Sequence, residues 1–246
     1  DEKSQIIGFI KTKPYGLVWE DSTELCWEQL KEYMPVLTEN KERAIISDNL
    51  EAPNHILIEG DNLLALTNLC ATHAGKIDVI YIDPPYNTGN KDFSYYDDFS
   101  DEYRQLPYVD RQDAFRHSKW LSFMKKRLSI AKRLLSERGV IFISIDDNEQ
   151  ANLKLLCDEI FGFDNFAGDI AWQRSYSPRN DSKGISVEKE HILVYSRSIN
   201  WTPKTLPRTS EMDSKYKNPD NDFAPWRSSD AFAPSAATHQ GMVYGI

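Results

Sequence analysis

Four consecutive residues, Asp83-Pro84-Pro85-Tyr86, bring together groups that suit one kind of chemistry. Proline has no backbone N–H and a fixed φ, and it holds the residue before it in an extended conformation, so this corner of the chain is stiff. The Asp83 carboxylate and a free proline carbonyl are two hydrogen-bond acceptors with no donor between them. Tyr86 adds an aromatic ring. Together these groups match a planar ring that carries an exocyclic amino group.

An amino group on a nucleobase is a poor nucleophile because its lone pair is conjugated into the ring. Two acceptors that bind its hydrogens favour a pyramidal nitrogen and free that lone pair, and stacking on an aromatic side chain contributes about 1–3 kcal/mol per base. Inside a duplex the amino nitrogen cannot be reached, so the base must be flipped out of the stack. The corner therefore predicts chemistry on the amino group of an extruded base.

The apolar patterns around the corner predict the elements that hold it. Residues 77–82 (IDVIYI) are β-branched or apolar except for Asp78 and predict a buried strand, which the prolines terminate. Apolar residues at steps of three and four predict a helix over 118–138, ended by Gly139, and residues 140–145 predict a second buried strand. These elements form a βαβ unit with parallel strands, so Asp83 is expected at the carboxyl edge, where open α/β sheets bind ligands.

Upstream of the corner, residues 56–58 predict another strand, and Gly60-Asp61-Asn62 predicts a turn. Leucines at helical spacing follow this turn, and Asp61 or Asn62 can cap the helix that they predict.

Downstream of the βαβ unit, two further strands are expected at residues 166–172 and 191–195. Asp147 with Gln150 fits a capping box at the start of the intervening helix. Capping is the favoured explanation for Asp146 and Asp147, although both follow a strand on the same side as Asp83.

The corner and four other blocks resemble the modification subunits of type III restriction–modification systems, from about Tyr15 to the C-terminus. Residues 83–89 (DPPYNTG) are similar to motif IV of the amino-group DNA methyltransferases that use S-adenosylmethionine, and aspartate at position 83 resembles the adenine-N6 type. A lone DPPY motif is weak evidence, but here the other blocks stand in the family's order. These blocks are residues 54–62, 117–121, 139–149 (GVIFISIDDNE) and 190–197 (EHILVYSR).

The resemblance implies a Rossmann-like α/β methyltransferase fold, with a largely parallel sheet flanked by helices, that is incomplete at the C-terminus. It implies methyl transfer from S-adenosylmethionine to adenine N6, with no metal. The residues implied are Asp83, Pro84, Pro85 and Tyr86 for catalysis and Asp61, Asn62 and Asp83 for the cofactor. For Asp61 and Asn62, helix capping is an equally good explanation and is compatible with a place at the pocket rim.

The sequence pattern and the resemblance together predict a domain organisation and partners. Residues 1–53 are expected to form a helical leader, 54–199 the catalytic core and 200–246 the start of a target-recognition region. The expected partners are double-stranded DNA with a flipped adenine and a restriction subunit with helicase and nuclease functions; a homodimer is a further option. Residues 87–117 are interpreted as a lid over the flipped base, and the basic loop at 173–189 as a candidate phosphate contact.

Composition narrows the class of protein. The net charge of −9 argues against a general basic DNA coat, although a local basic groove stays compatible with it. Cys26, Cys70 and Cys157 are widely spaced and form no CxxC pair, which indicates reduced thiols in the cytoplasm rather than a disulfide framework. No apolar run approaches the ~18 residues of a membrane span.

One expected motif is missing. Amino-methyltransferases also need a Gly-rich turn of the Phe-x-Gly-x-Gly kind for the cofactor, and the sequence contains none. In the permuted class, with motif IV first, that turn lies near the C-terminus, so we expect the chain to be the N-terminal catalytic part of a longer protein. The alternatives are cytosine-N4 methylation, RNA methylation and a non-catalytic module that binds DNA or a partner.

Overall fold

The computed structural model describes residues 19, 21–22, 24–44, 53, 55–89, 93, 109–174, 188–221 and 223–227. The chain divides into two units, Asp1–Trp201 and Thr202–Ile246. The corner and every strand of the sheet belong to the first unit.

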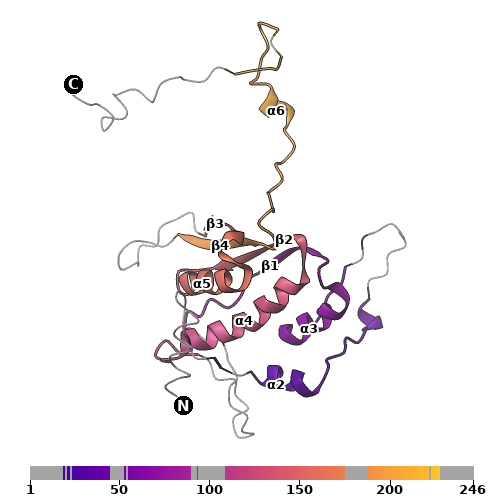
Figure 1. Ribbon diagram of the computed structural model, residues 1–246, viewed down its shortest axis with the longest axis vertical. Coiled ribbons are helices and arrows are strands. Elements are labelled where there is room, and N and C mark those ends of the chain that lie inside the picture. Colours follow the sequence, from indigo (N-terminus) through magenta and orange to yellow (C-terminus); the bar gives the residue numbers. More distant parts are fainter. Residues whose placement is uncertain are drawn as a thin grey trace, which may run out of the picture. The chain divides into compact units, whose positions relative to one another are not determined.

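A four-stranded sheet organises the first unit (Figure 1). Its strands lie in the order β1-β2-β4-β3 and are β1 (Ile77–Ile82), β2 (Leu135–Ile145), β3 (Phe166–Gln173) and β4 (Lys189–Ser196). The predicted α/β class is confirmed, as is the parallel pairing of β1 with β2. The expectation of a largely parallel sheet is wrong for these strands, because β4 runs antiparallel to both β2 and β3.

Three helices, α3 (Asn62–His73), α4 (Arg116–Leu134) and α5 (Gln150–Phe161), lie on the same side of the sheet (Figure 1). The side chains of Ile141, Ile143 and Ile145 in β2 face these helices and are fully buried. The stripe predicted for α4 is buried as well: Leu121, Met124, Leu128 and Ala131. Burial of this apolar surface is the main force that fixes β2 against the helix layer. Strand β1 packs there through Ile80 and Ile82, but Val79 and Tyr81 are 60% and 62% exposed, so the expectation of a buried strand is wrong for its other face.

Helix α4 ends at Leu134, and not at the predicted residue 138. Residues 135–139 join β2, so Gly139 lies inside a strand and does not cap the helix. The register slips at this point, because Ile77 pairs with Leu135 whereas Val79 pairs with Val140. A Cβ at position 139 would lie 2.9 Å from the Ile77 carbonyl oxygen. Because glycine has no Cβ, Gly139 allows β1 and β2 to approach each other closely at this point.

The strand expected at residues 56–58 is not formed. Ile56 is 74% exposed and Leu57 is 95% exposed, and neither joins the sheet. An apolar run becomes a strand only when another strand offers its backbone groups and a covered face. No described strand does so here.

The remaining helices are short. Helix α2 (Leu25–Glu32) and the 3₁₀ turns η1 (Lys41–Arg43) and η2 (Phe163–Asn165) belong to the first unit. In the second unit, α6 (Ser210–Asp213) is capped by the Thr209 hydroxyl, which accepts from the Met212 amide. Every helix in the described part of the chain is too short or too polar to span a bilayer.

Candidate active site

Strand β1 carries the predicted corner to the carboxyl edge of the sheet. The strand stops at Ile82, and Asp83 follows directly with its side chain exposed. Pro84, Pro85 and Tyr86 come next and are half-buried. The end of the strand is thus where the proline pair predicts it, and the carboxylate is accessible to a ligand.

A buried tryptophan holds the corner from the helix side. Trp120 of α4 is fully buried, and its indole Nε1 donates a hydrogen bond of 2.7 Å to the Pro85 carbonyl. Among the described residues, no hydrogen bond reaches the Pro84 carbonyl. The Pro84 oxygen is therefore the acceptor that remains for a ligand beside the Asp83 carboxylate.

Asp83 and Tyr86 face a cavity of about 300 Å³. This volume lies at the lower end of the usual range for small-molecule sites, about 300–1,000 Å³. The lining combines aromatic rings with hydrogen-bonding groups and comes from all four strands and the corner. The lining residues are Tyr81, Asp83, Tyr86, Ser144, Trp172, Glu190, His191 and Ile192.

The hydroxyl of Tyr86 is held as a neutral phenol. Burial raises the pKa of Tyr86 above its ordinary value, and a hydrogen bond to Asp83 and the negative charges of Asp83 and Glu190 raise it further. A neutral phenol can donate to the Asp83 carboxylate, and this pairs the two predicted catalytic side chains. Nearby, the Tyr81 hydroxyl and the Ser144 hydroxyl are hydrogen-bonded at 2.6 Å in the cavity wall.

His191, which the sequence pattern did not predict as a site residue, lines one side of the cavity and is held by three charged side chains. His191 Nδ1 lies 2.9 Å from Asp169 Oδ2, and its Nε2 lies 3.0 Å from Asp147 Oδ1 and 3.0 Å from Lys189 Nζ. The available signal was the Glu190–His191 pair in the block at residues 190–197. A strand pattern assigns such residues only to faces, so it could not show which of them lines a cavity.

The capping predicted for the residues after β2 is wrong in part. Helix α5 starts at Gln150 with Glu149 as its N-cap residue, and that position makes no side-chain capping bond. Asp146 instead accepts from the Asn148 amide at 2.9 Å, and Asp147 bonds to His191. Asp147 is therefore tied to the cavity wall and not to the helix end, because β4 places His191 within its reach.

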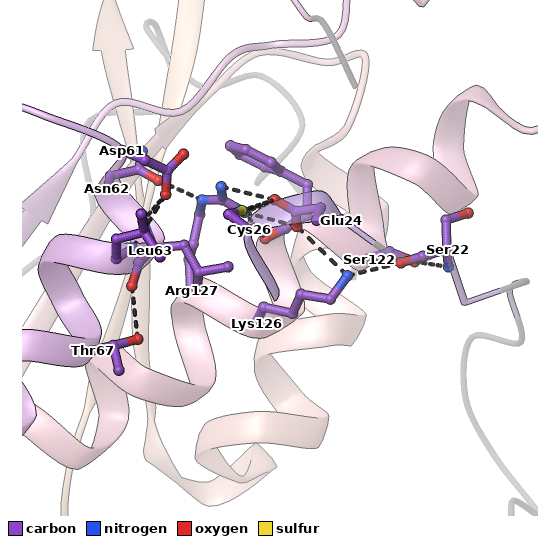
Figure 2. Close-up of polar contacts among 12 residues, drawn as sticks. Ser22, Glu24, Cys26, Asp61, Asn62, Leu63, Thr67, Ser122, Lys126 and Arg127 are labelled. Carbon is purple, nitrogen blue, oxygen red and sulfur yellow. Dashed lines mark hydrogen bonds and ion pairs between the residues drawn. The ribbon is translucent and has the colours of Figure 1, made fainter. Parts of the chain in front are cut away.

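The turn predicted for the cofactor lies at the start of α3 (Figure 2). Asp61 Oδ1 accepts from the amides of Leu63 and Leu64, at 2.8 and 3.2 Å, so Asp61 is the N-cap as predicted. Both bonds use one oxygen of an exposed carboxylate, which leaves Oδ2 outside the cap. Asn62 Oδ1 accepts from Arg127 Nε at 2.6 Å. Neither Asp61 nor Asn62 lines the cavity that contains Asp83.

Arg127 joins this turn to the leader. Figure 2 shows its guanidinium between Asn62 and Glu24, and its NH1 and NH2 donate to Glu24 oxygens at 3.0 Å. Both side chains are nearly buried, and Lys126 adds a second cation 3.5 Å from Glu24. Burial raises the pKa of the neighbouring Cys26 thiol to about 11, with the charges of Asp61 and Glu24 adding to the effect. Cys26, Cys70 and Cys157 are all free thiols.

Several expectations fall on residues that the structure does not describe. The lid proposed for residues 87–117 is described only at 87–89, 93 and 109–117, and most of the basic loop at 173–189 also lies outside the described residues. At the start of that loop, Arg174 Nε lies 3.3 Å from Glu190 Oε1. In the part of the chain that is described, no three His, Cys, Asp or Glu side chains are grouped as metal ligands.

The sequence profile described as DNA methylase matches residues 77–233. This match spans the corner, all four strands and α4 and α5, and it covers more than half of the chain. The chain therefore belongs to the DNA methylase family.

Two curated relatives show which kind of DNA methylase the chain resembles: the modification subunits of type III enzymes. The StyLTI Mod subunit of a type III restriction–modification enzyme from Salmonella typhimurium is 38% identical over 231 residues, which are 86% of this chain and 34% of that protein. The EcoP15I Mod subunit from Escherichia coli is 44% identical over 158 residues, 58% of this chain and 24% of that one. The resemblance to type III modification subunits is confirmed. The chain spans about a third or less of these relatives' length.

Among solved structures, TTHA0409 of Thermus thermophilus, in complex with S-adenosyl-L-methionine, is 19% identical with a TM-score of 0.39. That match covers 67% of this chain and 62% of TTHA0409.

Proposed function

We propose that the protein is a site-specific DNA methyltransferase of a restriction–modification system that transfers a methyl group from S-adenosylmethionine to adenine N6. One observation carries the proposal: the Asp83 carboxylate and the Tyr86 ring line an open cavity at the carboxyl end of β1. The relatives add to it, because they are named as Mod subunits of type III enzymes.

The chemistry follows from the acceptors of the corner. The Asp83 carboxylate and the Pro84 carbonyl accept the two N–H groups of the adenine amino group, and Pro85 keeps their spacing fixed. The nitrogen lone pair then forms the new N–C bond while the methyl group leaves its donor. Positioning supplies most of the rate, since the reacting atoms must be close and in line. The proton that the nitrogen then loses can pass to the Asp83 carboxylate.

S-adenosylmethionine supplies an activated methyl group on a sulfonium centre. The residues present fit part of this cofactor, because Asp61 and Asp83 are exposed carboxylates that can accept from its amine and hydroxyl groups. Asp61 can cap α3 through Oδ1 and still present Oδ2. The sequence has no Phe-x-Gly-x-Gly turn for the methionine end, so Asp61, Asn62 and Asp83 are proposed as the part of the cofactor site within this chain.

The substrate proposed is double-stranded DNA with one adenine flipped into the cavity, since an adenine inside the duplex cannot reach Asp83. Residues 200–246 are proposed as the start of the target-recognition region, after the leader (1–53) and the catalytic core (54–199). The proposed partner is a restriction subunit, since the relatives are named as subunits of type III restriction–modification enzymes. A second copy of the chain and a place in the cytoplasm are proposed as well.

Asp83 provides the test. The protein encoded by the complete reading frame would be incubated with tritiated S-adenosylmethionine and DNA from a bacterium that lacks the system. The DNA would then be digested to nucleosides. We expect label in N6-methyladenine, and we expect Asp83→Ala to abolish it while the thermal unfolding midpoint stays within about 3 °C, because an exposed side chain contributes little to stability.

Other products of the same experiment would overturn the assignment. Label in N4-methylcytosine would show that the target base is cytosine and not adenine. Label in RNA but not in DNA would show that the substrate is RNA. Full activity of the Asp83→Ala variant would remove the corner from the mechanism altogether.

A further inference from the structure

The exit from the catalytic corner is a backbone position with an unusual conformation. Asn87 follows Tyr86 directly and has φ 55°, in the left-handed region. Asparagine and aspartate tolerate this region better than other non-glycine residues. Asn87 is also fully buried, so its amide needs hydrogen-bond partners inside the protein.

A buried carboxylate meets this need. Asn87 Nδ2 donates to Glu149 Oε1 at 2.5 Å and to the Arg116 carbonyl at 3.3 Å. Its Oδ1 has no partner among the described residues, so the opposite amide orientation would set an oxygen against the Glu149 carboxylate. The orientation of the Asn87 side chain is thereby fixed by Glu149.

Glu149 is fully buried at the junction of β2 and α5. Besides Asn87, its Oε1 contacts His117 Nδ1 at 2.6 Å, and its Oε2 accepts from Asn152 Nδ2 at 2.7 Å. A buried charge is costly unless several hydrogen bonds stabilise it. Helix capping does not explain this placement, because the Glu149 side chain makes no capping bond to α5.

We propose that Glu149 is a positioning residue for methyl transfer: it fixes Asn87 in its left-handed turn and so sets the direction in which Tyr86 and Asp83 face the target base. This rests on the proposed function. Glu149 does not line the cavity, so its proposed route to the corner is the contact with Asn87. With Trp120 on the Pro85 carbonyl, Glu149 holds the corner at a second point along the chain.

The rate of methyl transfer should depend strongly on the contact between Asn87 and Glu149. A misplacement of about 1 Å lowers the rate roughly 100-fold in a reaction that depends on positioning. Binding of the cofactor should respond less than the rate, because only Asp83 of the three residues proposed to hold it lies in the corner, whereas Asp61 and Asn62 lie at the start of α3. A change in kcat without a matching change in KM for S-adenosylmethionine would thus be characteristic of the positioning role.

The experiment exchanges the donor and the acceptor. Asn87→Asp keeps the size and tolerates the left-handed φ, but it places two carboxylates in contact in a buried site. Adding Glu149→Gln to this variant restores one donor and one acceptor between the two side chains. Asn152→Asp is the matched control, because it sets an extra carboxylate against the other oxygen of Glu149, on α5 and away from the corner.

We expect N87D to lower kcat about 100-fold with KM for S-adenosylmethionine changed less than about threefold. The double variant N87D/E149Q should recover kcat to within about tenfold of the wild type, and N152D should lower it less than about fivefold. If N87D and N152D lower kcat equally, or if E149Q fails to rescue N87D, the positioning role is wrong.

Hydrogen exchange gives a readout that does not depend on methyl transfer. The backbone amides of Tyr86, Asn87 and Thr88 should exchange at least about tenfold faster in N87D and return towards the wild-type rate in N87D/E149Q. Unchanged exchange in N87D would overturn the proposal. If the wild-type protein transfers no methyl group to any nucleic acid, the proposed function fails, whereas the exchange rates still decide whether Glu149 holds the turn.

Discussion

At the scale of single residues, the corner depends on partners that lie far away in the sequence. The DPPY pattern predicted a stiff pair of acceptors, and the structure places Asp83 and Tyr86 on one cavity. Which proline carbonyl stays available is decided by Trp120, 35 positions downstream of Pro85. The sequence could not predict this pairing, or that of Asn87 with Glu149, because a motif gives residue types and spacing and only the folded chain chooses long-range partners.

The contact of Trp120 with Pro85 can be tested by Trp120→Phe. This change removes the indole donor and part of a fully buried ring, so we expect the free energy of unfolding to fall by about 1–3 kcal/mol in urea denaturation. The freed Pro85 carbonyl should also loosen the corner and lower methyl transfer about tenfold.

Tyr195→Phe is the matched control for this variant. Tyr195 is also a fully buried aromatic residue, and its hydroxyl donates to Asp158 Oδ1 at 2.7 Å, away from the cavity. It should lose about 1 kcal/mol of stability with unchanged methyl transfer. Equal losses of activity in both variants would mean that Trp120 acts on the fold as a whole.

At the scale of elements, the apolar periodicity predicted the helices better than their ends. The stripe of α4 is buried as expected, yet the helix stops four residues early, because Leu135 pairs with Ile77 and begins β2. For residues 56–58, the pattern was typical of a strand, but no strand in the described part of the chain pairs with these residues. Strand direction was also beyond the pattern, since a buried apolar run reads the same whether β4 is parallel or antiparallel.

Helix α3 allows the two roles of Asp61 to be separated. Asparagine caps a helix as well as aspartate does, so Asp61→Asn should leave the free energy of unfolding within about 0.5 kcal/mol, whereas Asp61→Ala should lower it by about 1 kcal/mol. If Asp61 also accepts from the cofactor, both variants should weaken S-adenosylmethionine binding about tenfold in calorimetry. Unchanged binding in Asp61→Asn would leave capping as the whole role of the residue.

At the scale of the whole first unit, the described residues Ser22 and Glu24 of the expected leader are tied to the helix layer. Glu24 pairs with Arg127 of α4, which also holds Asn62 of α3, so one guanidinium connects three segments (Figure 2). The Ser22 amide donates to the Ser122 hydroxyl, and Lys126 donates to the Ser22 carbonyl. The sequence predicted a helical cover here, but it could not show a buried ion pair between residues 103 positions apart.

Breaking that pair should cost far more than breaking an exposed one. Glu24→Ala leaves Arg127 buried without its carboxylate, and we expect the free energy of unfolding to fall by about 3–5 kcal/mol. Glu28→Ala is the matched control in α2, the helix that Glu24 precedes, since Glu28 pairs with Lys31 at 2.6 Å near the surface. It should change stability by less than about 1 kcal/mol in the same urea titration. Equal losses would show that the leader is held by other contacts.

Trp120 and Arg127 stand seven residues apart on α4, two helical turns, so one face of the helix meets both the Pro85 carbonyl and the Glu24–Asn62 pair. Inserting or deleting a single residue between them would rotate one contact away from the other by about 100°. This stretch of α4 therefore cannot change its length without releasing either the corner or the leader contact at Glu24.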